Sequence, residues 1–434
     1  MPYEPVDLIE VRCWGATVGA LALDPGSGFY VFEYDPAWSA TGVQLAPTTM
    51  PVGGREQSFV FPNLPPRTYL RLPALIADAL PDDFGNALTT AYLASEGVAA
   101  ADITPLDRLA YLGRRGMGAL EFRPGRGPRT RKATAVELSE LVVAARSALA
   151  GELRTESATT AAIKHLIAVG TSAGGARAKA VVALNPNTNE LRSGQVPVDP
   201  GFEPWLLKLD GVRPDLDRGG SGHYGRIEYA YSKMAAAAGI EMTACSLLEE
   251  GGRAHFMTRR FDRAPDGSKI HVQSLCALAH MDYKQIGAHD YAQLFLQIDA
   301  LDLGAEARAE AFRRMVFNVA AANCDDHSKN FAFVLPEGGQ WRLSPAYDLT
   351  HAYAPRSEWT HEHLMAVNGK RIGIDRNDID TVGDRFRVPN IARVIEQVLA
   401  AVADWPRHAA VAGVPSDVTE TVQADITTWS KPLH

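Results

Sequence analysis

The sequence predicts an α+β protein with a strand-rich lobe, a mostly helical lobe, and an additional β-rich subdomain at the N-terminus. Its 434 residues are too many for one ordinary core, so more than one lobe is expected. A hydrophobic content of 46% with 22% charged residues is typical of a globular chain. Strand-like patterns prevail up to residue 262 and helical patterns follow, so we expect domains at residues 1–124, 125–262 and 263–434.

In the first domain, two strand-like runs, EVRCWGATVGALAL and GFYVFEYD, are separated by the turn DPGSG. Two helical segments follow, LPALIADALPDDFGNALTTAYLASEG and TPLDRLAYL, and Pro81 should interrupt the first because proline breaks a helix. A strand, GALEF, comes next. The Pro-, Gly- and Arg-rich segment at residues 124–132 predicts a linker, and the domain boundary is placed there.

The second domain begins with a predicted helix, TAVELSELVVAARSALAG, and then turns to strands. The strand IKHLIAV leads through the glycine-rich GTSAGGARA into the strands KAVVAL and PWLLKLDG. An amphipathic helix is expected at residues 227–238, because apolar residues recur there at helical spacing. The strand pair CSLLEE and RAHFMTRRFD, joined by Gly-Gly, ends the domain at Asp262.

The third domain reads as mostly helical apart from one hairpin, formed by FAFVL, the turn PEGGQ and WRLSP. Antiparallel pairing about this turn places Phe331 opposite Pro345. The residues outside the strands, Asn330 and Asp348, should therefore lie at the same open end. An amide oxygen beside a carboxylate is a pair of ligands suited to Mg²⁺.

The segment NCDDHSKN, which precedes this hairpin, is dense in groups that bind metals or move protons. Asp325 lies five positions before Asn330, the spacing of the protein-kinase catalytic loop, where the Asp is the base and the Asn holds metal. His327 and Lys329 would face the transferred phosphoryl group or the surroundings of the metal. Each residue alone has an ordinary structural explanation, but together with the hairpin they favour a catalytic site.

A phosphoryl-transfer site also needs a lysine and a phosphate cradle. Lys208 lies inside the apolar strand WLLKLDG, where an unpaired ammonium group is costly, and Glu228 is the candidate ion-pair partner. The Gly-rich loop is not a Walker A motif, yet its backbone N–H groups would suit phosphate oxygens. The segment TRRFDR stands where a kinase holds adenine through its backbone.

These motifs, SAGGARAK, WLLKLDG, RRFDR, NCDDHSKN and SPAYDL in that order, resemble the HipA family of serine/threonine kinase toxins from bacterial type II toxin–antitoxin systems. LPDDFGNAL and DRLAYLGRRGMGALEF resemble the N-terminal subdomain of that family. The resemblance covers nearly the whole chain. It implies a protein-kinase-like two-lobed fold with the additional N-terminal subdomain.

The resemblance also implies roles for individual residues. Asp325 would be the catalytic base, and Asn330 and Asp348 would bind Mg²⁺. Residues implied to bind ATP are Gly174, Gly175, Ala176, Arg177, Ala178 and Lys179 in the phosphate loop, Lys208 at the phosphates, Arg259, Arg260 and Phe261 at the adenine hinge, and His327, Tyr347 and Asp348. Ser172 would be autophosphorylated. The sequence departs from the family at Arg177, where glutamine is common, and at Arg259, where an acidic residue is common.

The family resemblance implies an ATP- and Mg²⁺-dependent kinase that phosphorylates an aminoacyl-tRNA synthetase, typically the glutamyl enzyme. It also implies a small helix-turn-helix antitoxin, HipB-like, through which operator DNA would mainly be bound. Two alternatives remain open: a metal-dependent phosphohydrolase using Asp325, Asp326 and His327 as ligands, and a catalytically silent scaffold for the antitoxin. The HEH sequence at residues 361–363 is better explained by alternation than by a metal site.

Composition limits the other functions. The net charge of −8 argues against nucleic-acid binding through a diffuse positive field. The four cysteines, Cys13, Cys245, Cys276 and Cys324, form no CxxC pair, which argues against disulfides and a thiolate zinc site. The N-terminus lacks a signal-peptide pattern, and no apolar run reaches the roughly 18 residues that a membrane span needs. We therefore expect a cytoplasmic protein with no membrane partner.

Overall fold

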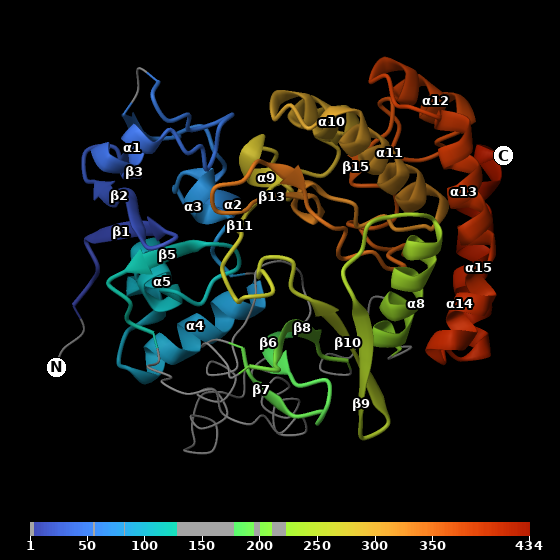
Figure 1. Ribbon diagram of the computed structural model, residues 1–434, viewed down its shortest axis with the longest axis horizontal. Coiled ribbons are helices and arrows are strands. Elements are labelled where there is room, and N and C mark those ends of the chain that lie inside the picture. The colour runs from blue at the N-terminus through green and yellow to red at the C-terminus, as the bar shows by residue number, and fades with distance from the viewer. Residues whose placement is uncertain (1–3, 55–56, 82, 128–177, 195–199, 211–222) are drawn as a thin grey trace. The chain divides into compact units, whose positions relative to one another are not determined.

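The computed structural model describes residues 4–54, 57–81, 83–127, 178–194, 200–210 and 223–434 (Figure 1). The chain divides into two compact units. The first comprises residues 1–213, 257–273 and 334–339, and the second comprises residues 214–256, 274–333 and 340–434. In the part of the chain that is described, no helix is both long and apolar enough to cross a membrane.

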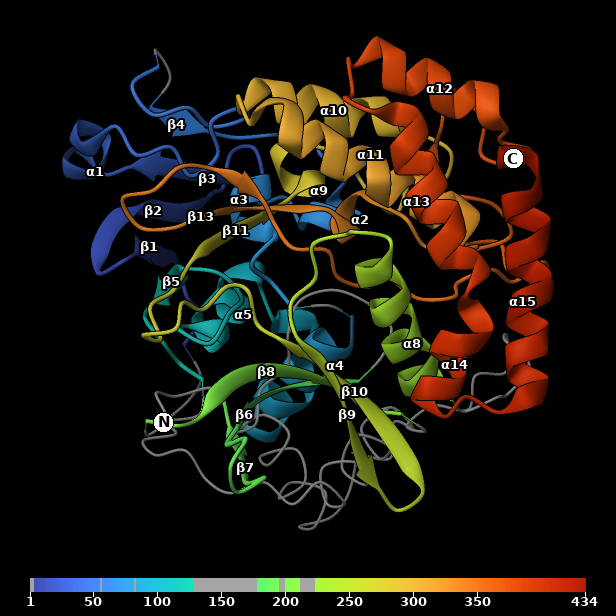
Figure 2. The same ribbon diagram turned by 45° about the vertical axis from the view of Figure 1, so that its right-hand side comes forward.

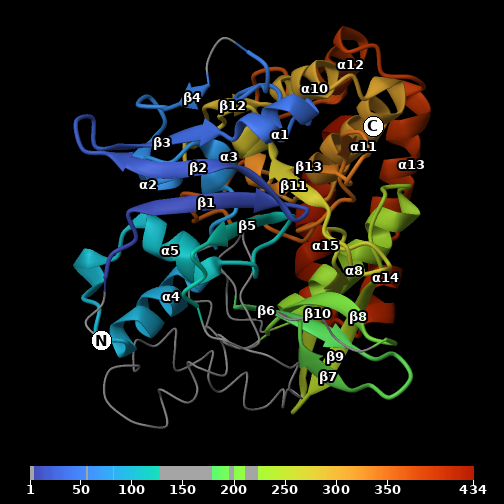
Figure 3. The same ribbon diagram turned by 60° about the vertical axis from the view of Figure 1, so that its left-hand side comes forward.

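The first unit contains a five-stranded antiparallel sheet in the order β4-β3-β2-β1-β5 (Figure 3). Its strands are β1 (Leu8–Cys13), β2 (Ala16–Asp24), β3 (Phe29–Tyr34), β4 (Ser58–Phe59) and β5 (Leu120–Arg123). Alternate residues of β1 are buried, as expected for a sheet with one covered face. A Cβ on Gly19 would come within 2.1 Å of the Glu33 carbonyl oxygen, so only glycine allows β2 and β3 to approach this closely.

The helical segments predicted at residues 72–97 and 104–112 are present in this unit, together with three short helices at residues 36–41, 66–69 and 100–102 that the sequence did not predict. They are α1 (Pro36–Thr41), α2 (Pro66–Tyr69), α3 (Ala74–Ala77), α4 (Asp83–Ser95), η1 (Ala100–Asp102) and α5 (Pro105–Leu112). The predicted interruption at Pro81 is confirmed, because α3 ends at Ala77 and α4 begins at Asp83. At α5, Thr104 and Asp107 form a reciprocal capping box, which fixes the start of the helix.

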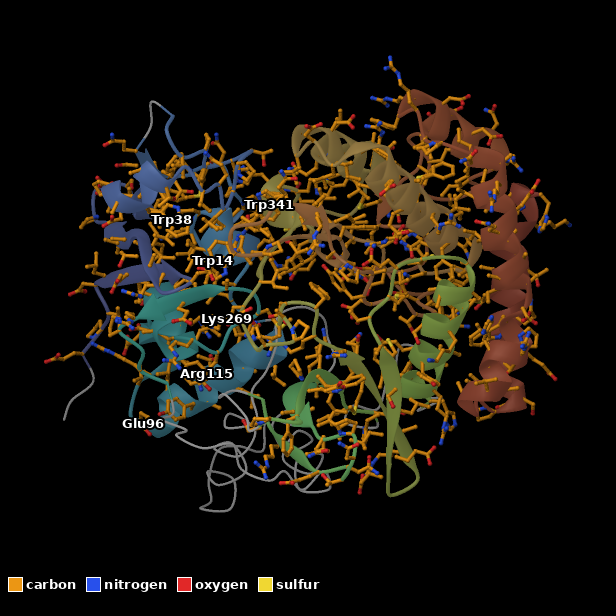
Figure 4. The ribbon with its side chains drawn as sticks, in the orientation of Figure 1. Trp14, Trp38, Glu96, Arg115, Lys269 and Trp341 are labelled. Atoms are coloured by element: carbon orange, nitrogen blue, oxygen red, sulfur yellow. The ribbon has the colours of Figure 1, made fainter. Side chains whose placement is uncertain are left out.

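Residues 257–273 are bound to the N-terminal sheet by hydrogen bonds. Trp14, in the turn between β1 and β2, donates from Nε1 to the carbonyl oxygen of Lys269 at 2.8 Å and stacks on Trp38 (Figure 4). The Lys269 ammonium group lies 2.9 Å from Glu121 Oε1 on β5. The backbone N–H of Gly118 donates to Asp262 Oδ2 at 2.8 Å. Through these contacts, residues 257–273 belong to the first unit.

A second set of strands also belongs to the first unit. β6 (Lys179–Leu184) pairs antiparallel with β7 (Leu191–Ser193) and with β8 (Glu203–Lys208). The last part of β10 (Arg253–Arg259) continues this sheet, and the N–H of Arg260 donates to the Pro204 carbonyl at 3.0 Å. The predicted strands KAVVAL and PWLLKLDG are confirmed. The helix expected at residues 134–151 and the strand expected at residues 163–169 lie outside the described residues.

The second unit is mainly helical (Figure 1). Its helices are α8 (Tyr224–Ala237), α9 (Leu275–Leu278), α10 (Tyr291–Ala300), α11 (Gly304–Ala320), η2 (Ser328–Asn330), α12 (Arg376–Arg385), α13 (Ile391–Ala403), α14 (Trp405–Ala412), α15 (Ser416–Ser430) and η3 (Lys431–Leu433). Their apolar faces share one core, in which Tyr231, Phe317 and Trp405 are fully buried. The predicted helix at residues 227–238 is α8, which begins three residues earlier.

The strands of the second unit are short, apart from β9 (Cys245–Glu250), which lies beside α8 and the first part of β10 (Figure 2). The predicted hairpin is β13 (Ala332–Leu335) with β14 (Arg342–Leu343). β11 (His271–Ser274), of which residues 271–273 belong to the first unit, is a strand that the sequence did not predict, and so are the parallel strands β12 (His289–Asp290) and β15 (Met365–Ala366). Two- to four-residue strands are too short for an alternating pattern to be recognised.

Candidate active site

The segment 323–330 connects α11 to the β13–β14 hairpin in the second unit. Helix α11 ends at Ala320, and Ala322 adopts a left-handed conformation with φ of 53°. This turns the chain away from the helix axis, so the following residues run as an extended loop until η2 begins at Ser328. Apart from Asp325, Lys329 and Asn330, the loop side chains are buried, so its conformation is set by the core.

Asp325 and Asn330 are brought together by this loop. The Asn330 Nδ2 group donates to the backbone oxygen of Asp325 at 2.7 Å, which spans the five-residue spacing seen in the sequence. The Asp325 carboxylate keeps 34% of its side-chain surface exposed, and its Oδ1 accepts a 2.6 Å hydrogen bond from Trp359 Nε1. Within the described residues, nothing donates to Asp325 Oδ2. One carboxylate oxygen is therefore held while the other is available as a base.

The hairpin brings Asp348 beside the same loop. The Ser344 N–H donates to the Ala332 carbonyl at 2.9 Å, which is the register expected from pairing Phe331 with Pro345. Beyond the hairpin, the hydroxyl of Tyr347 donates to the Lys329 carbonyl at 2.8 Å. Asp348 follows directly, in a left-handed conformation with φ of 55°, which Asp adopts more readily than most residues other than glycine.

The residues present suit a magnesium ion bound with a nucleotide. Because Asn330 donates from Nδ2, its Oδ1 is the atom available for a cation, and no described residue donates to that oxygen. Oδ1 of Asn330 and the carboxylate of Asp348 are the hard oxygen ligands that Mg²⁺ prefers. Among the described residues, no group of three or more His, Cys, Asp or Glu side chains could hold a metal. Mg²⁺ usually keeps water molecules and substrate phosphates among its ligands, so two oxygen ligands from the protein fit such an ion.

Asp326 is engaged entirely by the protein. Its side chain is fully buried, and Oδ2 accepts hydrogen bonds from the Tyr291 hydroxyl and from His363 Nδ1, both at 2.8 Å. Its Oδ1 accepts from the backbone N–H groups of Leu364 at 2.8 Å and Met365 at 3.4 Å. With four donors on two oxygens, Asp326 has no free position for a metal. It anchors the catalytic loop to the segment that contains β15.

The same network continues into α11. Asn318 Nδ2 donates to the Tyr291 hydroxyl at 2.9 Å, and Asn323 Nδ2 donates to Asn318 Oδ1 at 2.8 Å. All these side chains are buried, so each hydrogen bond replaces one that water would otherwise supply. The sequence indicated Asp326 as the second aspartate of a pair and, in the phosphohydrolase alternative, as a metal ligand. His363 is the second histidine of the HEH sequence. Its side chain is buried whereas that of His361 is 43% exposed, so the predicted alternation of side chains between the interior and solvent is confirmed.

An aromatic cluster that the sequence did not predict lies beside Asp325. The ring of His327 packs against Tyr283, with centroids 5.1 Å apart, and edge-to-face against Trp359 at 6.1 Å. The Lys329 ammonium group lies 5.5 Å from the centre of the Tyr283 ring. His327 Nε2 is 3.8 Å from Asp325 Oδ1, too far for a hydrogen bond. The only signal for Trp359 was a lone tryptophan in a polar segment.

In the first unit, Lys208 lies at the end of β8 and is directly opposite Lys179 at the start of β6. Residues directly opposite in an antiparallel pair project from the same face of the sheet. Both lysines are almost fully buried, with 8% and 4% of their surface exposed. Two ammonium groups on one face of the sheet give that face a positive charge, which favours an anionic ligand. Glu228 is also buried, on α8 in the second unit.

The predicted hinge residues have a structural role in the first unit. Arg260 is buried, and its guanidinium group binds both oxygens of Asp262, at 2.8 and 2.6 Å. Burial alone would raise the pKa of Asp262, but Arg260 and Arg263 outweigh it and hold that pKa well below its ordinary value. Because the Arg260 N–H pairs with β8, any adenine contact at Arg260 would have to use its carbonyl oxygen. Arg259 is half-exposed and lies 3.5 Å from Glu203.

The remaining predicted residues are in the glycine-rich loop. Ser172, Gly174, Gly175, Ala176 and Arg177 lie outside the described residues. Ala178 is described and buried, and its carbonyl accepts from the N–H of Leu209 at 2.9 Å. The loop therefore leads directly into the end of the sheet where Lys179 and Lys208 face each other.

Comparisons with known proteins place these features in a family. The chain matches the family model of the HipA-like C-terminal domain over residues 171–405, which is more than half of its length, and that of the HipA N-terminal domain over residues 9–123. Its structure also matches a chain of the Shewanella oneidensis MR-1 complex of HipA, HipB and operator DNA. That match has a TM-score of 0.68 at 16% identity and covers 98% of this chain and 96% of the other. It confirms the predicted α+β, kinase-like fold with an additional N-terminal subdomain.

Sequence relatives match over shorter stretches. The chain is 31% identical over 118 residues to the "Putative kinase Y4dM" of Sinorhizobium fredii, which is 25% of this chain and 28% of that protein. It is 25% identical over 155 residues to a "Putative kinase" of Haemophilus influenzae, covering 32% of this chain and 44% of that protein. In both cases this chain spans less than half the length of the curated relative.

Proposed function

The chain belongs to the HipA family, and on that premise we propose that it is an ATP- and Mg²⁺-dependent serine/threonine protein kinase acting as the toxin of a type II toxin–antitoxin module. The observation that carries the proposal is the geometry of the loop 325–330. Asp325 presents one held and one available carboxylate oxygen, Asn330 spans the loop to it, and Tyr347 ties the following Asp348 to the same loop. These are the positions that a kinase uses for its base and its metal ligands.

In the proposed reaction, Asp325 Oδ2 accepts the proton of the substrate hydroxyl as the hydroxyl oxygen attacks the γ-phosphorus of ATP. The bond between the γ-phosphorus and the β–γ bridging oxygen breaks, and ADP leaves. Asn330 and Asp348 would hold Mg²⁺, which when bound neutralises the charge of the phosphates. Lys179 and Lys208 would bind phosphate oxygens from their shared face of the sheet. Little covalent chemistry falls to the protein in such a transfer, so positioning and charge stabilisation supply most of the rate.

The structure bears on the alternatives. A phosphohydrolase using Asp325, Asp326 and His327 as metal ligands needs Asp326, whose oxygens already accept four hydrogen bonds in a buried position. A catalytically silent scaffold would not need an exposed carboxylate at Asp325 or two buried lysines in register. The kinase hypothesis accounts for both features.

We further propose the partners that the family implies. The structurally similar Shewanella chain was solved with HipB and operator DNA, which supports a HipB-like helix-turn-helix antitoxin for this chain. Given the net charge of −8, operator DNA would be bound mainly through that partner. An aminoacyl-tRNA synthetase, of the glutamyl type that the family implies, is the proposed substrate class, and Ser172 is the proposed site of self-inactivating autophosphorylation.

The test is transfer of labelled phosphate from ATP, with Mg²⁺, to proteins of a bacterial lysate and to the chain itself. Asp325→Ala should lower the rate by about 10²–10⁴, the usual contribution of a positioned base, while ATP binding persists. Asp348→Ala should in addition weaken Mg²⁺-dependent ATP binding, because it removes a charged ligand. Asp384→Ala, on the exposed face of α12, is the matched control. Near-normal transfer by both site variants would refute the assignment.

A further inference from the structure

The segment 354–361, which follows Asp348 along the chain, folds into a compact turn around Ser357. The Ser357 hydroxyl accepts hydrogen bonds from the N–H groups of Trp359 and Thr360, both at 3.1 Å. The Ser357 N–H donates to the Ala354 carbonyl at 2.9 Å, and the Ala354 N–H donates to the Thr360 carbonyl at 3.1 Å. Four hydrogen bonds within seven residues fix the backbone at Trp359 without help from a helix or a strand.

This turn directs the indole of Trp359 to the catalytic loop. Its Nε1 donates to Asp325 Oδ1 at 2.6 Å, a short bond typical of a charged acceptor. Its ring meets His327 edge-to-face at 6.1 Å, with an interplanar angle of 67°, and Tyr283 at 6.5 Å, with an angle of 85°. The indole is therefore held by its backbone, by two rings and by the carboxylate.

The carboxylate of Asp325 has few other restraints. Its terminal torsion is of the kind that rotates broadly, and about a third of the side chain is exposed to solvent. The Asn330 amide holds only the backbone of Asp325, and His327 Nε2 is beyond hydrogen-bonding distance at 3.8 Å. Among the described residues, the only hydrogen bond to the carboxylate is that from Trp359.

We infer that Trp359 is a positioning residue that orients the catalytic base. By holding Oδ1, the indole N–H leaves Oδ2 in a fixed position to accept the substrate proton. An indole N–H is a donor only, so Trp359 cannot take up the proton itself and acts through Asp325. The inference rests on the proposed kinase function, since it assigns Asp325 as the base.

The experiment compares Trp359→Phe with wild type, using the acceptor protein identified by labelled ATP. Phenylalanine keeps an aromatic ring against His327 and Tyr283, removes the N–H donor, and shortens the ring system from nine atoms to six. We expect kcat to fall about tenfold, the size expected for one hydrogen bond to a charged group, while the KM for ATP changes less than about twofold. Ser357→Ala, which loosens the turn, should shift kcat in the same direction by a smaller factor.

Trp405→Phe is the matched control, because Trp405 Nε1 also donates to an oxygen, the Thr419 carbonyl at 3.1 Å, but in the core of the same unit. It should lower the unfolding temperature and leave kcat unchanged at temperatures where the variant is folded. A Trp359→Phe protein with unchanged or increased kcat overturns the inference, and so does a fall in kcat matched by an equal rise in KM. If Asp325→Ala is itself active, the proposed function fails instead, so the two failures are distinguishable.

Discussion

Replacing Asp326 by asparagine tests the claim that a buried network, rather than a metal, holds the catalytic loop. The change replaces one oxygen of the carboxylate by an NH₂ group. That NH₂ group faces hydrogen-bond donors that have no other acceptor among the described residues. If the amide oxygen keeps the Leu364 N–H, the NH₂ group meets the Tyr291 hydroxyl and His363 Nδ1. Tyr291 already accepts from Asn318, so its own proton loses its acceptor.

A change of tautomer at His363 does not restore the lost hydrogen bond without a new cost. It could accept at Nδ1 by moving its proton to Nε2, but Nε2 is buried and has no partner. Two buried groups are therefore left unsatisfied, at about 1–3 kcal/mol each. We expect Asp326→Asn to lower the free energy of unfolding by about 2–6 kcal/mol in urea denaturation. The Leu364 amide should also exchange its hydrogen faster, because its acceptor is weakened.

The matched control is Asp425→Asn, which alters a second His–Asp pair in the same unit. Asp425 Oδ2 lies 3.0 Å from His351 Nε2, but both side chains are partly exposed. Its loss should therefore cost less than about 1 kcal/mol. The reasoning is refuted if Asp326→Asn costs no more than Asp425→Asn, or if exchange at Leu364 is unchanged.

Two further predictions concern the first unit. Asp262→Asn should lower its free energy of unfolding by about 3–5 kcal/mol, because Arg260 and Arg263 are left as buried, uncompensated charges; a change below about 1 kcal/mol in urea denaturation would contradict this. Stability should also fall on acidification from about pH 6.5 to pH 4, since burial lowers the pKa of His271 to about 4. As the pH falls, His271 takes up a proton in the unfolded state before it does so in the folded state. The contribution of neutral His271 to the free energy of unfolding is therefore complete above pH 6.5 and is lost as the pH falls toward 4. A His271→Gln variant should show a flatter dependence of unfolding midpoint on pH in this range, and an equal slope in both proteins would refute the cause.

Much of the fold and part of the site followed from the sequence by itself. Three features depend only on nearby residues. The strand KAVVAL follows from its run of apolar and β-branched residues, the helix break near Pro81 from proline geometry, and the hairpin register from the length of the turn. The pairing of Asp325 with Asn330 was also predictable, because five residues in one short loop cannot lie far apart. The order of motifs then identified the family.

Tertiary structure alone decided which groups surround Asp325. Trp359 and His363 are 34 and 37 residues from the aspartates they contact, and no periodicity links positions so distant along an irregular chain. The roles of the adjacent Asp325 and Asp326 likewise diverge only through burial: one is partly exposed and the other is enclosed by four donors. Burial depends on what packs against a loop from elsewhere in the chain. The sequence therefore determined the kinds of chemistry available, and packing determined which aspartate is free to perform it.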